Sequence, residues 1–361
     1  MSSGSLPDSS GRKTVMVNLW RFITRIFGSC VSAWTFLTAW VNILLRNYES
    51  PVWVVGEARS GTTWLMELLG SDGKRRVLFE PFHPKFNHTL KLTPLHNYVP
   101  TDHDEMDFRD FCANVFQGKL FNGRVDAYRN YRLFHSGLVI KDVYANLLLP
   151  YMSKNFDKVR KILILRNPIA VALSKQKRPM GHWINNPVDF LTDDALVKDH
   201  LEPFADMIRS LEDDYFQKQV MIWCVVHYVP LRVLGPNLLH VVLYEELFAD
   251  PIKELLRINR FLGENVVPVD DRILNVVDVP SRMTERSRQF FSSQKNLSFR
   301  PGIENATLRS CARIMRAFGM EGFYGDRFDT PNSEDVLRFL REAHASSSDS
   351  QASFREEKRL S

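Results

Sequence analysis

A glycine-rich stretch in the first fifth of the chain combines the residue types that bind phosphate groups. It spans residues 52–70 and reads VWVVGEARSGTTWLMELLG. Gly56 and Gly61 have the spacing of a phosphate-binding loop, G-x-x-x-x-G-K-[ST], but Thr62 stands where that loop has its lysine, and Thr63 supplies the final hydroxyl. Because a nucleoside triphosphate needs the lysine and a magnesium ion, the stretch favours a smaller anion.

The loop offers several hydrogen-bond donors to such an anion. Its order is strand, glycine-rich turn and helix N-terminus, where backbone N–H groups and the helix dipole attract negative charge. We predict that Arg59, Ser60, Gly61, Thr62 and Thr63 bind the anion through one fixed charge, three hydroxyls and the backbone. The alternative is a turn that only packs the helix against the strand.

A second candidate anion site follows the apolar run KILIL. Arg166 comes directly after this run, and Ser174 lies eight residues further on, about two turns into a helix that Pro168 is suited to begin. Ligands of open α/β sheets bind at the carboxyl ends of the strands. We therefore expect Arg166 and Ser174 to form a second anion site. The alternative is that Arg166 forms a surface salt bridge.

The elements that position these residues follow from an alternation of apolar runs and helical patterns. From Pro51 onward, the runs VWVV, VLF, LVI, KILIL and HVVLY are typical of buried parallel strands. Helical patterns begin near residues 63, 168 and 251, and the first and third end at Gly70 and Gly263. This alternation predicts an α/β fold with a central parallel sheet flanked by helices.

Three motifs in this order resemble those of the sulfotransferase family. E-x-RSGTTWL resembles the loop that binds the 5′-phosphosulfate of the donor, 3′-phosphoadenosine 5′-phosphosulfate (PAPS). Residues 161–177, KILILRNPIAVALSKQK, resemble the segment that binds the 3′-phosphate, and residues 241–264 resemble a third family segment. The resemblance covers roughly residues 51–325 and implies a P-loop-like sulfotransferase fold with PAPS as co-substrate.

The resemblance also implies roles for individual residues toward the donor. Arg166 and Ser174 would hold the 3′-phosphate, and Arg59 would stabilise the 5′-phosphate as it leaves. Residues 298–305, SFRPGIEN, resemble a loop that closes over the adenosine bisphosphate, so Arg300 would contact the 3′-phosphate.

The general base is also assigned by resemblance. VLFEPFHP places Glu80 where carbohydrate sulfotransferases carry a glutamate before a proline. Members that act on small phenols and steroids instead use a histidine two residues after a lysine; here Lys141 matches the lysine and Val143 occupies the histidine position. The resemblance implies Glu80 as base, Lys141 at the sulfuryl group and a carbohydrate hydroxyl as acceptor. Alternatives are a structural Glu80 bonded to Arg59 or backbone, His83 as base, and a Lys141 that reaches solvent.

Other functions stay open on the sequence. A protein tyrosine or a small-molecule hydroxyl is the alternative acceptor; a nucleotide-dependent kinase and a non-catalytic glycan or nucleotide binder are the alternative classes. We expect no metal, because His83 and His88 are poorly spaced and the four cysteines lie far apart. The net charge of +5 suits an anionic ligand, and the absence of a dense Lys/Arg run gives no indication of nucleic acid.

The two ends of the chain differ from its centre. Residues 1–13 and 342–361 are polar and are expected to be disordered, whereas residues 51–328 are expected to form the sulfotransferase domain. Residues 14–46 are predicted to form an extra hydrophobic N-terminal helix, in which residues 26–45 lack charge over a length that could cross a bilayer. Basic residues precede it, as in a type II protein of the Golgi lumen. The alternatives are a helix packed on a cytoplasmic domain or lying on a membrane surface.

Overall fold

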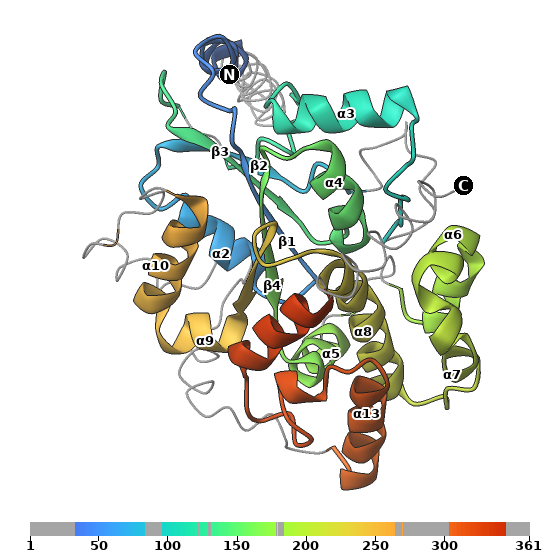
Figure 1. Cartoon of the computed structure of the whole chain (residues 1–361). Helices are drawn as coiled ribbons and strands as arrows, with labels where there is room; N and C mark the ends of the chain where they lie inside the picture. Colours follow the sequence, from blue (N-terminus) through green and yellow to red (C-terminus); the bar gives the residue numbers. More distant parts are fainter. Residues whose placement is uncertain are drawn as a thin grey trace, which may run out of the picture.

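A five-stranded parallel sheet runs through the protein (Figure 1). The computed structural model describes residues 33–83, 96–121, 123–128, 131–177, 179, 184–263, 269 and 303–343. The strand order is β2-β3-β1-β4-β5, and every neighbouring pair is parallel. The strands are β1 (Val52–Gly56), β2 (Arg75–Phe79), β3 (Gly137–Asp142), β4 (Arg160–Leu165) and β5 (Leu239–Leu243). All five predicted strands and the parallel α/β architecture are thus confirmed.

Each strand contains a continuous apolar run because both faces of the sheet are covered. Trp53 and Val55 of β1 belong to one core, and Val52 and Val54 belong to the other. The second core is closed by α2 (Thr62–Leu69), α9 (Tyr244–Ala249) and α10 (Pro251–Leu262). The first is closed by α3 (Met106–Phe116), α4 (Leu149–Asn155), α5 (Pro168–Lys177), α8 (Tyr215–Val233) and α13 (Asn305–Ala317).

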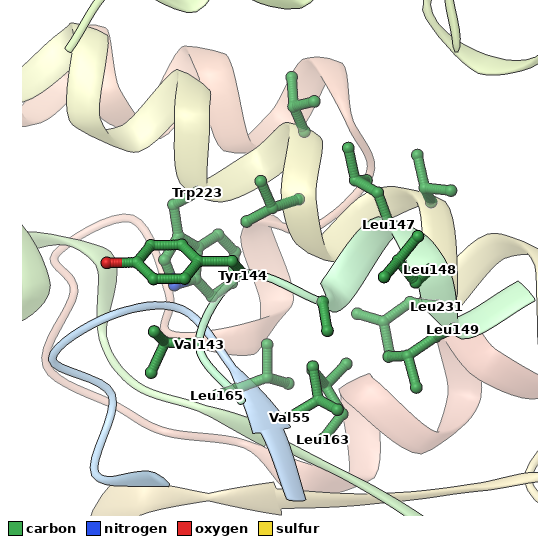
Figure 2. Packing of buried hydrophobic residues seen from close by; sticks show 14 of the residues in the cluster. Val55, Val143, Tyr144, Leu147, Leu148, Leu149, Leu163, Leu165, Trp223 and Leu231 are labelled. Atoms are coloured by element: carbon green, nitrogen blue, oxygen red, sulfur yellow. The ribbon is translucent and has the colours of Figure 1, made fainter. Parts of the chain in front are cut away.

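The segment after β3 is buried in the larger core. Figure 2 shows Val143, Tyr144 and residues 147–149 beside strand residues of β1 and β4, with Trp223 and Leu231 of α8 behind them. This packing fixes the carboxyl end of β3, where Lys141 lies.

The remaining helical elements are short. They are α6 (Asp194–Leu196) and α7 (Ala205–Arg209), a π-helical turn at Val197–Leu201, and 3₁₀ turns at Asn146–Leu148, Pro187–Thr192, Glu202–Phe204 and Glu321–Phe323. The predicted helices at 63, 168 and 251 correspond to α2, α5 and α10, and α10 ends at Gly263 in the left-handed conformation. The longest helix among the described residues, α8, was not predicted, because it is apolar on nearly every side and lacks a clear helical period.

Two helices lie at the ends of the described chain. Residues 33–44 are helical, and residues 333–343 form a helix whose Leu340 and Ala343 are fully buried, beyond the domain end expected at residue 328. No helix in the described ranges is long and apolar enough to cross a bilayer. The disordered tail expected from residue 342 begins later, because residues 342 and 343 belong to the C-terminal helix. Residues 26–32 of the predicted span lie outside the described ranges, as do residues 1–13 and 344–361, so a type II Golgi arrangement and disorder at the two ends stay predictions.

Candidate active site

The register of the sheet brings the chemical residues to one edge. Val55 of β1 pairs with Asp142 of β3, Phe79 of β2 pairs with Lys141, and Gly56 pairs with Ile164 of β4. The strands are parallel, so the glycine-rich loop, Glu80 and Arg166, which follow carboxyl ends, and Lys141, which lies in the last residues of β3, are all at the same edge. This is the edge where open α/β sheets bind ligands.

The loop before α2 has the backbone of an anion-binding turn. Arg59 has φ 73° and Gly61 has φ 91°, so left-handed residues alternate with Ser60. Such alternation turns successive N–H groups toward one concave side. A side chain at Gly61 would overlap the ring of Tyr244, so the position requires glycine both for its φ and for space.

The two predicted phosphate sites touch each other. The Arg59 Nε donates a hydrogen bond of 3.0 Å to the Ser174 Oγ on α5, and the Arg166 Nη1 donates one of 2.9 Å to the Arg59 carbonyl. The alternative considered from the sequence, a surface salt bridge of Arg166, is wrong, because the residue is buried and its guanidinium lies over the Tyr244 ring at 4.5 Å. Residues from two distant motifs therefore form one cationic site.

Two buried polar atoms of this site lack a hydrogen-bond partner within the described residues. They are the Ser60 Oγ and the Arg166 Nε. An unsatisfied buried donor costs free energy, about 1–3 kcal/mol. The site therefore gains from an added group with acceptor oxygens, and the phosphate groups of PAPS fit this requirement.

Residues of the third motif pack against the two predicted phosphate sites. Tyr244, the first residue of α9, lies between Gly61, Trp64 and Arg166. Its neighbour Glu245 is buried and accepts a hydrogen bond of 2.9 Å from the Asn167 backbone N–H. Burial raises the pKa of Glu245. The third motif thus contacts Arg166 through Tyr244 and the next residue, Asn167, through Glu245. It also packs against the glycine-rich loop.

A buried charge cluster joins the loop to α5. The Lys175 Nζ lies 2.7 Å from one Glu57 carboxylate oxygen, and the His96 Nε2 lies 3.3 Å from the other. Burial would raise the pKa of Glu57, but the charges of Lys175 and His96 outweigh it and hold the pKa well below its usual range. Because Lys175 follows Ser174, the loop is attached to α5 at two successive residues.

The predicted base and the predicted sulfuryl-binding lysine form a direct pair. The Lys141 Nζ donates a hydrogen bond of 2.6 Å to the Glu80 Oε1, and the Arg124 Nη2 donates one of 3.1 Å to the Oε2. These partners differ from the Arg59 or backbone contact considered from the sequence. Glu80 also has φ 51°, which is rare for a residue with a side chain and is found most often at functional sites.

Lys141 is held inside the protein. Only 2% of its surface is exposed, and its ammonium group lies 4.5 Å from the centre of the Phe79 ring. Burial lowers the pKa of Lys141, and the Glu80 carboxylate opposes that shift. The alternative that this lysine reaches solvent is therefore wrong, and its charge depends on Glu80.

Asp142 fixes the turn that carries Glu80. Its carboxylate accepts hydrogen bonds from the Trp53 Nε1 at 2.8 Å and from the Phe82 backbone N–H at 3.0 Å. Burial raises the pKa of Asp142 to about 7, although both hydrogen bonds and Lys141 oppose the shift. His83, the competing base, is buried one turn further on, with its ring against Tyr144.

Most of the predicted site residues thus lie at one edge of the sheet. Thr62 is buried and Thr63 is half-buried in the first turn of α2. Arg300 lies outside the described residues, and its contact with a 3′-phosphate stays a prediction. The roles of Arg124, Tyr244 and the Glu57–Lys175 pair in the site were not predicted from the sequence. Glu57, Lys175 and Tyr244 stand within the three motifs, which is a signal that could have indicated them, whereas Arg124 lies outside the motifs.

The fold and the loop define an α/β protein with a P-loop-like nucleotide-binding edge. A model of the sulfotransferase family matches residues 51–268, which is more than half of the chain. The match includes the glycine-rich loop, Glu80, Lys141 and Arg166. The chain belongs to the sulfotransferase family, and it is a sulfotransferase.

A comparison with solved structures gave matches of low identity and low TM-score. The sulfotransferase domain of the Synechococcus PCC 7002 olefin synthase is 17% identical, with 73% of this chain and 94% of that chain covered and a TM-score of 0.38. The Alicyclobacillus acidocaldarius sulfotransferase is 14% identical, with 79% of this chain and 97% of that chain covered and a TM-score of 0.35. Mouse sulfotransferase SULT7A1 complexed with PAP is 16% identical, with 82% of this chain and 89% of that chain covered and a TM-score of 0.34. A search of curated proteins gave no match.

A metal site was not expected from the sequence. Over the ranges that the structure describes, no group of three or more His, Cys, Asp or Glu side chains is placed to hold a metal ion. Metal-free chemistry stays a prediction that activity assays with chelators would test.

Proposed function

We propose that this sulfotransferase moves a sulfuryl group from PAPS to a hydroxyl of a carbohydrate, with Glu80 as the general base. One observation supports the proposal most strongly. The cationic site of Arg59 and Arg166 and the Glu80–Lys141 pair follow neighbouring strands of the same sheet edge. A donor with two phosphate positions and a reacting hydroxyl need such a pair of sites side by side.

The donor would be held by the two cross-linked motifs. The loop N–H groups, the Ser60 hydroxyl and Arg59 bind the 5′-phosphate, while Arg166 and Ser174 bind the 3′-phosphate. The Arg59 Nε–Ser174 Oγ bond of 3.0 Å is then exchanged for bonds to phosphate oxygens. When bound, PAPS supplies an activated sulfuryl group whose leaving group is the 5′-phosphate of adenosine 3′,5′-bisphosphate.

The acceptor hydroxyl would react beside Glu80. Glu80 accepts the hydroxyl proton as the acceptor oxygen forms its bond to sulfur, and the electron pair of the breaking S–O bond passes to the 5′-phosphate. Lys141 and Arg59 stabilise the negative charge on the sulfuryl and phosphate oxygens through preorganised donors. Arg124, whose side chain is 38% exposed, reaches Glu80 from the solvent side and holds its carboxylate in place.

Two features support a carbohydrate acceptor over a phenol. Val143 is buried in the core where the small-molecule enzymes have a histidine, and Glu80 precedes Pro81 as in the carbohydrate enzymes. A panel of radiolabelled transfer assays with oligosaccharides, simple phenols and tyrosine-containing peptides would test the acceptor class. Transfer to peptides alone would move the assignment to protein tyrosine.

Ligand binding would test the donor site independently of the acceptor. Thermal unfolding of the full chain is measured with adenosine 3′,5′-bisphosphate, AMP or Mg-ATP, in the wild type and in Arg166→Ala. A ligand at about 100 times its Kd adds roughly 2.7 kcal/mol of stability. We expect stabilisation by the bisphosphate that is lost in Arg166→Ala. Stabilisation by Mg-ATP without the bisphosphate would refute PAPS as donor and favour a kinase.

A further inference from the structure

The helix at residues 33–44 has its polar side inward and its apolar side in solvent. Thr38, Ala39 and Asn42 are buried against the domain. The exposed side carries large apolar groups, and Leu44 is 76% exposed. These groups are Trp34, Phe36, Leu37, Trp40, Leu44 and, just after the helix, Leu45. In a water-soluble domain an amphipathic helix has the opposite orientation.

Hydrogen bonds fix this rotation of the helix. The Asn42 Nδ2 donates to the Thr38 carbonyl at 2.7 Å and to the Leu133 carbonyl at 2.9 Å. The Asn42 Oδ1 accepts from the His135 backbone N–H at 2.7 Å and from the Asn47 Nδ2 at 2.8 Å. Turning the apolar side inward would break the two bonds to Leu133 and His135 and leave these backbone groups of the domain unpaired.

A second segment continues the same apolar surface. Tyr131, Leu133 and Phe134 are exposed just before β3, and Phe134 is 62% exposed. The Trp34 Nε1 donates to the Tyr131 carbonyl at 3.0 Å, and so joins the two segments. We call this surface the apolar face. It consists of the exposed apolar residues within positions 33–45 together with Tyr131, Leu133 and Phe134. Two chain segments thus contribute to one surface that water does not favour.

Charge in this part of the chain complements an anionic surface. Residues 9–48 contain no Asp or Glu, but they contain Arg12, Lys13, Arg21, Arg25 and Arg46. Of these, only Arg46 lies within the described residues; it directly follows the apolar face, its side chain is 80% exposed, and it lies 3.6 Å from the Glu49 carboxylate. An excess of cationic residues in the sequence around an apolar helix with tryptophans is typical of helices that lie in the interface of a bilayer.

We propose that the apolar face is a membrane-docking surface that lies flat on a bilayer with anionic lipids. The helix at residues 33–44 would rest in the interface, with its tryptophans at the level of the head groups. The Asn42 side remains bonded to the domain, so docking requires no rearrangement of the described residues. The proposal stands on exposure, hydrogen bonding and charge, and does not rest on the proposed acceptor or donor.

Docking would direct the candidate active site away from the bilayer. The apolar face lies beside the residues that precede β3, whereas Glu80 and Lys141 lie at the carboxyl ends of β2 and β3. Figure 1 shows the dark blue helix at one end of the molecule, with α5, α9 and α13 at the other. The active site would therefore face the aqueous phase while the protein is bound to the membrane.

Vesicle flotation of the full chain tests the proposal. The vesicles contain phosphatidylcholine alone or phosphatidylcholine with about one third phosphatidylserine, which gives an anionic surface. Leu44→Glu and Phe134→Glu place a carboxylate in each segment of the apolar face. Met106→Glu is the matched control, because Met106 is 74% exposed on α3 and lies outside the apolar face.

We expect the wild type and Met106→Glu to float with the anionic vesicles, and less with the neutral ones. Leu44→Glu and Phe134→Glu should each weaken binding about tenfold or more, because each loses buried apolar area and gains a repelled charge. Equal flotation of all four proteins would overturn the proposal and assign binding to residues upstream of the helix. No flotation, with a dimer that Leu44→Glu dissociates in light scattering, would instead assign the face to a second copy of the chain.

Discussion

Lys175 and Glu57 form a buried ion pair of 2.7 Å that attaches the glycine-rich loop to α5. Their side chains are 4% and 2% exposed, so the pair has almost no contact with water. The preceding residue, Ser174, accepts a hydrogen bond from Arg59 of the same loop. The shape of the proposed 5′-phosphate site therefore depends on a helix that belongs to the 3′-phosphate site.

Lys175→Met should destabilise the protein strongly, because it leaves the Glu57 carboxylate buried without its main partner. Loss of one partner from a buried pair costs about 3–5 kcal/mol. Chemical denaturation would measure the change in the free energy of unfolding. Lys177→Met, an exposed lysine on the same helix, is the control and should cost less than about 0.5 kcal/mol. Equal free energies of unfolding for the two variants would show that the Glu57–Lys175 pair does not stabilise the protein.

Gly61→Ala should abolish donor binding. The added Cβ would overlap the Tyr244 ring, and φ 91° disfavours any residue with a side chain. Gly73→Ala is a matched control, because Gly73 also has a positive φ of 64° but has free space around it. We expect a cost of about 1–2 kcal/mol for each from the backbone. Calorimetric titration with adenosine 3′,5′-bisphosphate should show weakened binding only in Gly61→Ala; equal affinities would contradict the role of the loop.

Glu80→Gln should lower kcat by about 10²–10⁴-fold, the usual contribution of a general base. The KM for the donor should change little, because Glu80 contacts Lys141 and Arg124 rather than the phosphate-binding loop. Loss of the carboxylate also lowers the pKa of Lys141 further, so folding should be checked in parallel. Glu105→Gln, an exposed carboxylate, serves as control. Retained turnover in Glu80→Gln together with lost turnover in His83→Gln would transfer the role of base to His83.

Stability should fall as the pH decreases from about 6.5 to 4, and His227 should contribute to this fall. Burial lowers the pKa of His227 to about 4, although Glu57 opposes the shift. The unfolded chain then binds a proton near pH 6.5 that the folded chain does not bind until pH 4. By linkage, the contribution of neutral His227 to the free energy of unfolding is fully present above pH 6.5. It decreases as the pH falls below 6.5, by roughly 3 kcal/mol at pH 4.

His227→Leu should reduce this pH dependence in denaturation curves recorded between pH 4 and 7. His103→Leu, with a side chain that is 36% exposed, should leave the dependence unchanged. The same slope in wild type and His227→Leu would show that other groups are responsible.

Much of the fold could be predicted because its strands are buried on both faces. VWVV, KILIL and HVVLY are continuous apolar runs, and only a sheet covered on both sides requires such runs. The loop before α2 was equally visible, because a glycine with positive φ, hydroxyls and an arginine occur within a few residues. These features depend on residues that are close together in the sequence, so they could be predicted from the sequence.

The sequence alone determined the class of fold, the glycine-rich loop and the order of the chemical residues. Tertiary structure decided which of them meet. The pairs Glu57–Lys175, Arg59–Ser174 and Glu80–Arg124 join residues that lie far apart in the chain, and no periodicity records a contact of that kind. The helix at residues 33–44 shows the same limit: its pattern gave a hydrophobic helix, but hydrogen bonds from Asn42 to a segment ninety-odd residues away turned the apolar side outward, because buried amides must be paired.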